Sequence, residues 1–184
     1  MRKKVGLILV AAAMCAFTAC SQESAQSKAG EKGAQPEAAA PQASSKSLVV
    51  YYSQTGATKK LAEIFQKAKN ADVFEIATVT PYPSTYDSTI AAVGAQRESK
   101  QWPALVNAKA DLAKYDTVYL GYPIMFGSFA PPVYTFLDSN DLSGKVVVPF
   151  CTYGSGGRKA SAAELKTLEP NANVTLAYGI SNKR

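Results

Sequence analysis

Strand-like and helix-like segments alternate along the chain from Leu48 onward, and this alternation constrains the fold more than any other feature. Five segments are short and mostly apolar, as expected of strands that are covered on both faces. They span Leu48–Tyr52, Val73–Val79, Thr117–Tyr122, Lys145–Cys151 and Asn173–Ile180. The stretches between them carry apolar residues at helical spacing. The alternation predicts an α/β fold, in which a parallel sheet has helices on both faces.

The first two expected helices also show where a helix begins and ends. Leu61 and Ile64 recur at helical spacing after the first strand, and Asn70 marks the expected end of that helix. After the second strand, Ser84–Asp87 resembles a capping box. This pattern would place Tyr86 on the apolar face of the following helix.

The chain contains no histidine, and this absence excludes several kinds of site. A Ser-His-Asp or Cys-His nucleophile system, an imidazole base and a His-ligated zinc site cannot be built from this chain alone. Its three cysteines, Cys15, Cys20 and Cys151, lack zinc-type spacing, and the common phosphate-loop, dinucleotide-binding and Gly-x-Ser-x-Gly motifs are absent from the sequence. The function of this protein must then depend on backbone groups, hydroxyls, aromatic rings or a bound cofactor.

The first residues have the pattern of a secretory signal peptide. Arg2–Lys4 precede an apolar run over Val5–Ala13, and small residues follow up to Cys20. The end of this segment, Phe17–Cys20, resembles the bacterial lipobox, whose cysteine is lipidated and becomes the new N-terminus. We therefore expect a lipoprotein signal peptide over residues 1–19 and a lipid anchor at Cys20, which attaches the protein to a bacterial cell-envelope membrane on its periplasmic or outer face. Ordinary secretion without lipidation is the alternative.

Residues 20–47 are expected to form a lipidated, disordered tether. Ser21–Ser47 contains no Val, Ile, Leu, Met, Phe, Trp or Tyr, so it cannot bury enough apolar surface to offset the entropy of ordering. As a random coil it would hold the folded domain, residues 48–184, on the order of 30 Å from its anchor. Cleavage would also remove three of the 20 basic side chains, so their excess over 14 acidic ones gives little reason to expect nucleic-acid binding.

Three predicted loops follow the carboxyl ends of strands, where ligands bind in sheets of this kind. They span Ser53–Thr58, Pro123–Phe129 and Thr152–Gly157, and they are rich in glycine, hydroxyls and aromatic rings. The first loop joins a strand to a helix N-terminus, where hydroxyls and free backbone amides can bind a phosphate without an arginine. A plain turn in which Thr58 caps the helix is the alternative.

The same loops carry a resemblance to a known family. Val50–Ala62 closely resembles the flavodoxin signature, and Tyr122–Gly127 and Pro149–Gly154 resemble the corresponding loops of a branch of flavodoxin-like bacterial proteins. The resemblance covers Leu48 to about Ile180. It implies an open five-stranded parallel sheet in the order 2-1-3-4-5 with helices on both faces. Flavodoxins close with another helix after the fifth strand, and the domain is expected to lack that last helix.

The resemblance further implies that the cofactor is FMN. The residues that would hold the ribityl phosphate are Ser53, Gln54, Thr55, Gly56, Ala57 and Thr58. The residues that would flank the isoalloxazine ring are Pro123, Ile124, Met125, Phe126 and Gly127 in the second loop and Thr152, Tyr153, Gly154, Ser155 and Gly156 in the third. Phe126 and Tyr153 could stack on a flat ring, and ordinary packing within their loops is the alternative. Met125 and Phe126 replace two tryptophans of the branch.

These features predict an FMN-binding lipoprotein that carries or transfers electrons outside the cytoplasm. Its partner would be a redox protein or a small quinone-like acceptor, and a homodimer could cover the sheet face that the absent helix leaves open. One alternative is an NAD(P)H:quinone-type flavin reductase. Another is a flavin-free binding or scaffold lipoprotein, because a fold does not by itself establish a function.

Overall fold

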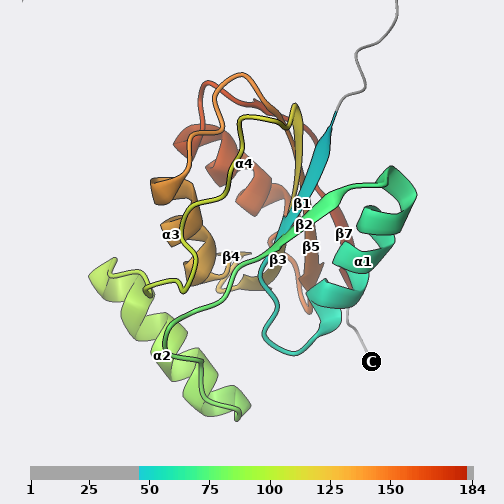
Figure 1. Cartoon of the computed structure of the whole chain (residues 1–184). Coiled ribbons are helices and arrows are strands. Elements are labelled where there is room, and N and C mark those ends of the chain that lie inside the picture. Colours follow the sequence, from blue (N-terminus) through green and yellow to red (C-terminus); the bar gives the residue numbers. More distant parts are fainter. Residues whose placement is uncertain (1–45, 182–184) are drawn as a thin grey trace, which may run out of the picture. The chain divides into compact units, whose positions relative to one another are not determined.

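A parallel sheet forms the core of the protein (Figure 1). The computed structural model describes residues 46–181, so the predicted signal peptide, Cys20 and nearly all of the predicted tether lie outside the described residues. The strands of this sheet are β1 (Ser47–Tyr51), β2 (Asp72–Glu75), β3 (Thr117–Met125), β5 (Val146–Tyr153), β6 (Asn173–Val174) and β7 (Tyr178–Ser181). Their order is β2-β1-β3-β5-β6, and β7 also pairs with β5. If β6 and β7 are counted as one fifth strand, this is the predicted order 2-1-3-4-5, and the predicted α/β fold class is confirmed.

Helices cover both faces of the sheet. The helices are α1 (Ala57–Lys69), α2 (Tyr86–Ser99), α3 (Pro131–Ser139) and α4 (Arg158–Leu168), of which α2 packs against α3. Helix α1 packs on one face, against β1, β3 and β5, whereas α3 and α4 lie on the other (Figure 1). A short antiparallel strand, β4 (Ser128–Phe129), folds back on the end of β3. Within residues 46–181 no helix follows β7, and none of the helices is long and apolar enough to cross a bilayer.

The central strands are apolar along their whole length because both of their faces are buried. Val49 and Tyr51 of β1 belong to the core cluster beside α1, together with Phe150 of β5. Val50, between them, belongs to the larger cluster on the opposite face. Gly121 of β3 makes room for this packing, since a Cβ atom there would lie 2.2 Å from the Phe150 ring.

The second strand is shorter than predicted. β2 ends at Glu75, whereas the sequence pattern predicted a strand over Val73–Val79. Beyond β2 the chain leaves the sheet, and Thr78 forms an isolated antiparallel bridge with Leu105. The prediction was wrong because an apolar run shows that a segment is extended and buried, but not which distant segment will pair with it.

The fifth strand is interrupted, although the sequence predicted a continuous strand over Asn173–Ile180. The strand pairings leave Thr175–Ala177 between β6 and β7. Thr175 N donates to Val147 O at 2.9 Å, so the backbone groups of Val147 point toward the fifth strand. Backbone groups alternate in direction along a strand, so those of Pro149, two residues on, point the same way. Because proline has no N–H group, it cannot continue the ladder there.

The sequence correctly predicted where α1 ends, but it predicted two buried side chains, one on α1 and one on α2, that are exposed in the structure. Asn70 ends α1 in the left-handed conformation, with φ 47°. Thr85 caps α2, because its hydroxyl accepts a hydrogen bond from Ser88 N at 3.4 Å, one residue later than the predicted capping box begins. Ile64 and Tyr86 are 60% and 78% exposed, although the spacing predicted that both would face the core.

Candidate functional site

A cavity of about 780 Å³ opens at the carboxyl ends of β1, β3 and β5. The three predicted loops supply most of its lining, which is Gln54, Thr55, Pro123, Ile124, Met125, Phe126, Gly127, Thr152, Tyr153, Gly154, Ser155, Gly156 and Gly157. The start of α2 and the loop before it supply the rest, which is Ser84, Tyr86, Thr89 and Ile90. Ligand crevices of parallel sheets lie at this place, and ligand sites generally measure roughly 300–1,000 Å³. The cavity is therefore the candidate functional site.

The lining of this cavity carries no charged side chain within the part of the chain that the structure describes. It consists of hydroxyls, one side-chain amide, aromatic rings, aliphatic side chains, the Met125 thioether and glycine backbone. Among residues 46–181 there is also no group of three or more His, Cys, Asp or Glu that could hold a metal ion. The cavity can bind and orient an aromatic ligand, but it provides no carboxylate or imidazole for acid–base catalysis.

The first loop leads into α1 through a glycine. Gly56 is the N-cap residue, with φ 84°, and it has no side chain that could form a cap hydrogen bond. The first turn contains no acidic residue, so nothing there neutralises the partial positive charge of the free amides. Ser53 Oγ accepts a hydrogen bond from Lys59 N at 3.2 Å. The start of α1 is thus suited to bind an anion from the cavity side.

Thr58 joins the first loop to the third. Its side chain is only 1% exposed, and its hydroxyl lies 2.9 Å from the hydroxyl of Thr152. Thr58 does not cap α1, so the alternative of a plain turn capped by Thr58 is wrong. Of the predicted residues of the first loop, Gln54 and Thr55 line the cavity, whereas Ser53, Gly56, Ala57 and Thr58 do not.

The second loop is a β-hairpin whose tip reaches the cavity. Met125 pairs with Ser128, so Phe126 and Gly127 form a two-residue turn. Their φ angles are 52° and 80°, as a type I′ turn requires. The left-handed conformation costs a residue with a side chain about 1–2 kcal/mol. Phe126 is also 56% exposed, so little packing offsets that cost, and strain of this kind concentrates at functional sites.

Glu164 of α4 holds the hairpin in place. Its two carboxylate oxygens accept hydrogen bonds from the Ser128 hydroxyl and from the Tyr134 phenol. Burial, and then the bond to Glu164, raise the pKa of Tyr134, so its phenol stays protonated as the donor. Arg97 Nη2 donates to Phe129 O at 2.7 Å. Side chains from α2, α3 and α4 therefore fix β4 and, through β4, the turn at the cavity.

Replacing Glu164 with alanine is expected to lower the free energy of unfolding by about 2–3 kcal/mol, because two buried hydroxyls lose their acceptor. The Glu164→Gln variant keeps the size and one carbonyl acceptor, and it is expected to lose about 1 kcal/mol. Urea unfolding of the three proteins measures both differences. Losses near zero for both variants would contradict this role of Glu164.

The third loop packs directly on the hairpin. Gly157 is the N-cap of α4 and has φ 94°. A Cβ atom at this position would lie 2.5 Å from Ile124 Cγ2 and 2.7 Å from Gly127 O. Only glycine permits both this conformation and this approach. Tyr153, at the end of β5, also lines the cavity and is half-buried.

The start of α2 and the loop before it form a cavity wall that the sequence pattern did not predict. Thr89 Oγ1 donates to Pro83 O at 2.7 Å, and Gln54 Nε2 donates to the same oxygen at 3.5 Å. Gln54 Oε1 in turn accepts a hydrogen bond from Tyr52 OH at 2.6 Å, so this wall is tied to the first loop. The sequence did offer one indication of this wall. The segment follows the second strand, so it lies at the same end of the sheet as the other three loops.

Comparisons with known proteins agree with this geometry. A family model described as flavodoxin matches residues 46–180. A putative flavoprotein from Bacteroides uniformis has a similar structure, with 30% identity, a TM-score of 0.69, and coverage of 76% of this chain and 92% of that one. A flavoprotein from Lactobacillus acidophilus, solved in complex with FMN, is 25% identical, with a TM-score of 0.67 and coverage of 73% of this chain and 93% of that one.

A curated relative gives a further comparison. It is NAD(P)H dehydrogenase (quinone) 3 of Rhizobium meliloti, which is 30% identical over 126 residues. The match covers 63% of this chain and 58% of that protein, so the chain spans less than two thirds of its length. The family model, by contrast, covers the sheet up to Ile180 and all three loops that line the cavity. The chain belongs to the flavodoxin family.

Proposed function

We propose that the protein binds FMN and carries or transfers electrons outside the cytoplasm. The observation that carries this proposal is the uncharged cavity, rich in hydroxyls, aromatic rings and glycine, whose lining residues Gln54 and Thr55 lead into the glycine-capped start of α1. The structure of the Lactobacillus acidophilus flavoprotein with FMN supports the same cofactor here. Bound FMN would supply the electron chemistry, for which the cavity has no acid or base of its own.

The ribityl phosphate would bind at the start of α1. The backbone amides of Gly56, Ala57 and Thr58 and the hydroxyl of Thr55 are the donors available there. The Thr58 hydroxyl is already bonded to Thr152, so Thr58 would contribute its amide and keep the first and third loops together. The nearest cation in sequence, Lys59, pairs with Glu75 at 3.5 Å. Because Lys59 is paired with Glu75, we expect helix amides and hydroxyls to bind the phosphate.

The isoalloxazine ring would lie between the hairpin and the third loop. Phe126 and Tyr153 provide aromatic faces from the two sides, and Met125 adds a polarisable thioether. Gly127 and Gly154 also line the cavity, and their backbone groups would contact the flavin edge. Such contacts adjust the flavin potential, while the cofactor performs the electron transfer.

Phe126→Asn is expected to separate stability from binding. Asparagine tolerates the left-handed conformation better than phenylalanine, so the free energy of unfolding should stay the same or rise by up to about 1 kcal/mol. FMN affinity should fall roughly twofold to tenfold, because stacking of an aromatic pair contributes about 0.5–1.5 kcal/mol. Urea unfolding and an FMN titration measure the two effects. Unchanged affinity would assign Phe126 to packing within its loop.

An FMN titration of the purified chain tests the proposal directly. The apo-protein should quench FMN fluorescence in a saturable way, at one FMN per chain, and the protein isolated from cells should be yellow. A folded, colourless protein that leaves FMN fluorescence unchanged would contradict the proposal. It would favour the alternative of a flavin-free binding or scaffold protein.

A flavin reductase that takes hydride from NAD(P)H and reduces a quinone is the second candidate. The relative from Rhizobium meliloti favours it, although the chain matches only 58% of that protein. Steady-state oxidation of NADPH with a soluble benzoquinone distinguishes the two functions. An electron carrier should show no turnover above free FMN, whereas a reductase should show saturation in both substrates.

The location and assembly of the protein are also part of the proposal. The signal-like residues 1–19 and Cys20 support a lipid anchor on the periplasmic or outer face of a bacterial membrane. Tyr178 and Ile180 of β7 are 61% and 52% exposed, which supports a homodimer that covers this edge. Metabolic labelling with a palmitate analogue tests the lipid anchor, and analytical sedimentation of the detergent-solubilised chain tests the homodimer.

A further inference from the structure

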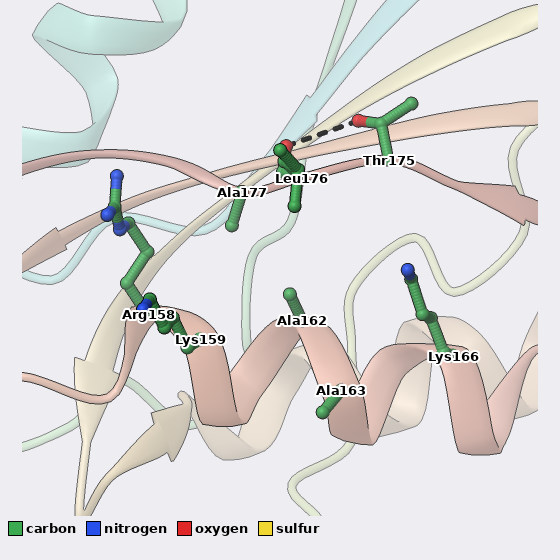
Figure 2. Close-up of a pocket in the computed structure, with 8 residues that line it drawn as sticks. All are labelled: Arg158, Lys159, Ala162, Ala163, Lys166, Thr175, Leu176 and Ala177. Atoms are coloured by element: carbon green, nitrogen blue, oxygen red, sulfur yellow. Dashed lines mark hydrogen bonds between the residues drawn. The ribbon is translucent and has the colours of Figure 1, made fainter.

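A second cavity, of about 410 Å³, lies between α4 and the segment that separates β6 from β7. Its lining is Arg158, Lys159, Ala162, Ala163, Lys166, Thr175, Leu176 and Ala177, and we call it the α4 groove. Figure 2 shows Arg158 and Lys159 at the start of the helix, Lys166 farther along it, and Leu176 and Ala177 on the facing segment. The interruption of the fifth strand thus creates one side of the groove.

The α4 groove has an uncompensated positive charge. Three of its residues, Arg158, Lys159 and Lys166, are cations, and none of its residues is acidic. The ion pairs among residues 46–181 are those of Lys59 and Lys114, so no carboxylate pairs with the three cations. Glu164 lies on the same helix, but its carboxylate is bonded to Ser128 and Tyr134. The groove is therefore complementary to an acidic surface.

The α4 groove also offers an apolar anchor point. Ala162, Ala163 and Ala177 supply small side chains between the cations, and Leu176 beside them is 85% exposed. Protein interfaces combine an apolar centre with charged residues at the rim. An acidic protein surface with an apolar side chain at its centre fits this arrangement.

The groove borders the FMN cavity. Gly157 lines that cavity, and the next residue, Arg158, lines the groove. At Gly179 of β7, a Cβ atom would lie 2.9 Å from both Arg158 Cδ and Tyr153 Cε1, so both side chains approach Gly179. Tyr153 belongs to the cavity wall. A protein seated on the groove would therefore lie next to the Tyr153 side of the cavity.

We propose that the α4 groove is the docking surface for an acidic electron-transfer protein. Carboxylates of the partner pair with Arg158, Lys159 and Lys166, and an apolar side chain of the partner packs on Leu176. The redox role of the partner rests on the proposed FMN function, because it follows from the neighbouring cavity. The docking itself depends only on the charge and shape of the groove, so it can be measured with or without flavin.

Calorimetric titration of the full chain in mild detergent with a plant-type [2Fe–2S] ferredoxin, an acidic electron carrier, tests the proposal. The expected result at an ionic strength of about 10 mM is measurable binding that weakens steeply with added salt. Lys159→Glu/Lys166→Glu is expected to raise the Kd tenfold or more, because both exposed side chains then repel the ferredoxin. Leu176→Ser should raise the Kd roughly threefold to tenfold without changing the salt dependence.

The matched control is Lys60→Glu/Lys67→Glu on α1. It changes the net charge by the same amount at two exposed lysines on the other face of the sheet. Its Kd should stay within about threefold of the parent, so a loss equal to that of the α4 variant would overturn the proposal. Absence of ferredoxin binding, or binding of the groove to anionic phosphatidylglycerol vesicles instead, would also overturn it.

A protein that does not bind FMN would give a different result from a protein that lacks the docking surface. In the first case the chain would not quench FMN fluorescence, while the apo-protein would still bind ferredoxin through Lys159 and Lys166. A chain that binds FMN but not ferredoxin would keep the proposed function and lose the docking surface. Basic cytochrome c, titrated in parallel, should show no binding that depends on the α4 lysines.

Discussion

The Thr55→Glu variant is expected to bind FMN about 100-fold more weakly than the parent protein, which corresponds to about 2.7 kcal/mol. Thr55 lines the cavity just before the glycine-capped start of α1, where we place the phosphate. A carboxylate there would repel the phosphate and would itself interact with the free helix amides. For that reason the free energy of unfolding should not fall, and it should rise by up to about 0.5 kcal/mol.

The Thr55→Gln variant is the matched control, because glutamine has the size of glutamate without its charge. It should bind FMN within about fivefold of the parent, as a neutral donor replaces the hydroxyl. Fluorescence titration gives the affinities and urea unfolding gives the stabilities. Equal affinities for the Glu and Gln variants would place the phosphate elsewhere and remove the role assigned to the first loop.

Gly157→Val should have the largest effect on the fold and on the cavity together. The residue has φ 94°, and a Cβ atom would lie 2.7 Å from Gly127 O, a backbone atom that cannot rotate away. Left-handed strain of about 1–2 kcal/mol and overpacking of about 1–3 kcal/mol predict a total loss of about 2–5 kcal/mol. Because the hairpin must move to make room, FMN affinity should fall as well.

Gly154→Ala is the control in the same loop. Gly154 does not have a positive φ angle, and a Cβ atom there meets nothing within 4 Å. Its Tm in the absence of FMN should therefore remain close to that of the parent. Thermal unfolding of both variants, with and without FMN, measures the effects. A Gly157→Val protein as stable as Gly154→Ala would show that the hairpin and the third loop do not depend on this close approach.

Much of the fold and most of the cavity could be predicted from the sequence. The apolar runs of β1, β3 and β5 and the helical spacing between them are local patterns, and they fixed the fold class. The three loops could be located because each directly follows a strand. Of the sixteen cofactor residues predicted from the sequence, twelve line the cavity, and Thr58 lies behind it in contact with Thr152. Their binding of FMN remains a prediction.

The parts that the sequence could not provide depend on contacts between distant segments. The wall from Ser84 to Ile90 contributes to the cavity because the chain after β2 packs against the first loop through Pro83 O. The spacing of Tyr86 indicated a buried helix face, but the cavity side of α2 leaves it exposed. Apolar periodicity describes one element at a time, so it cannot show what stands opposite that element.

The sequence by itself determined the order of strands and helices and the place of the strand-end loops, and it determined that these loops carry hydroxyls, glycines and aromatic rings and that the chain has no histidine. Only the tertiary structure decided that Gly157 packs on Gly127, that Thr58 bonds to Thr152 and that an unpaired basic groove borders the cavity. Secondary structure follows from neighbouring residues, whereas these contacts join loops 30 to 94 positions apart. Their geometry is set by how helices and strands pack in the whole domain.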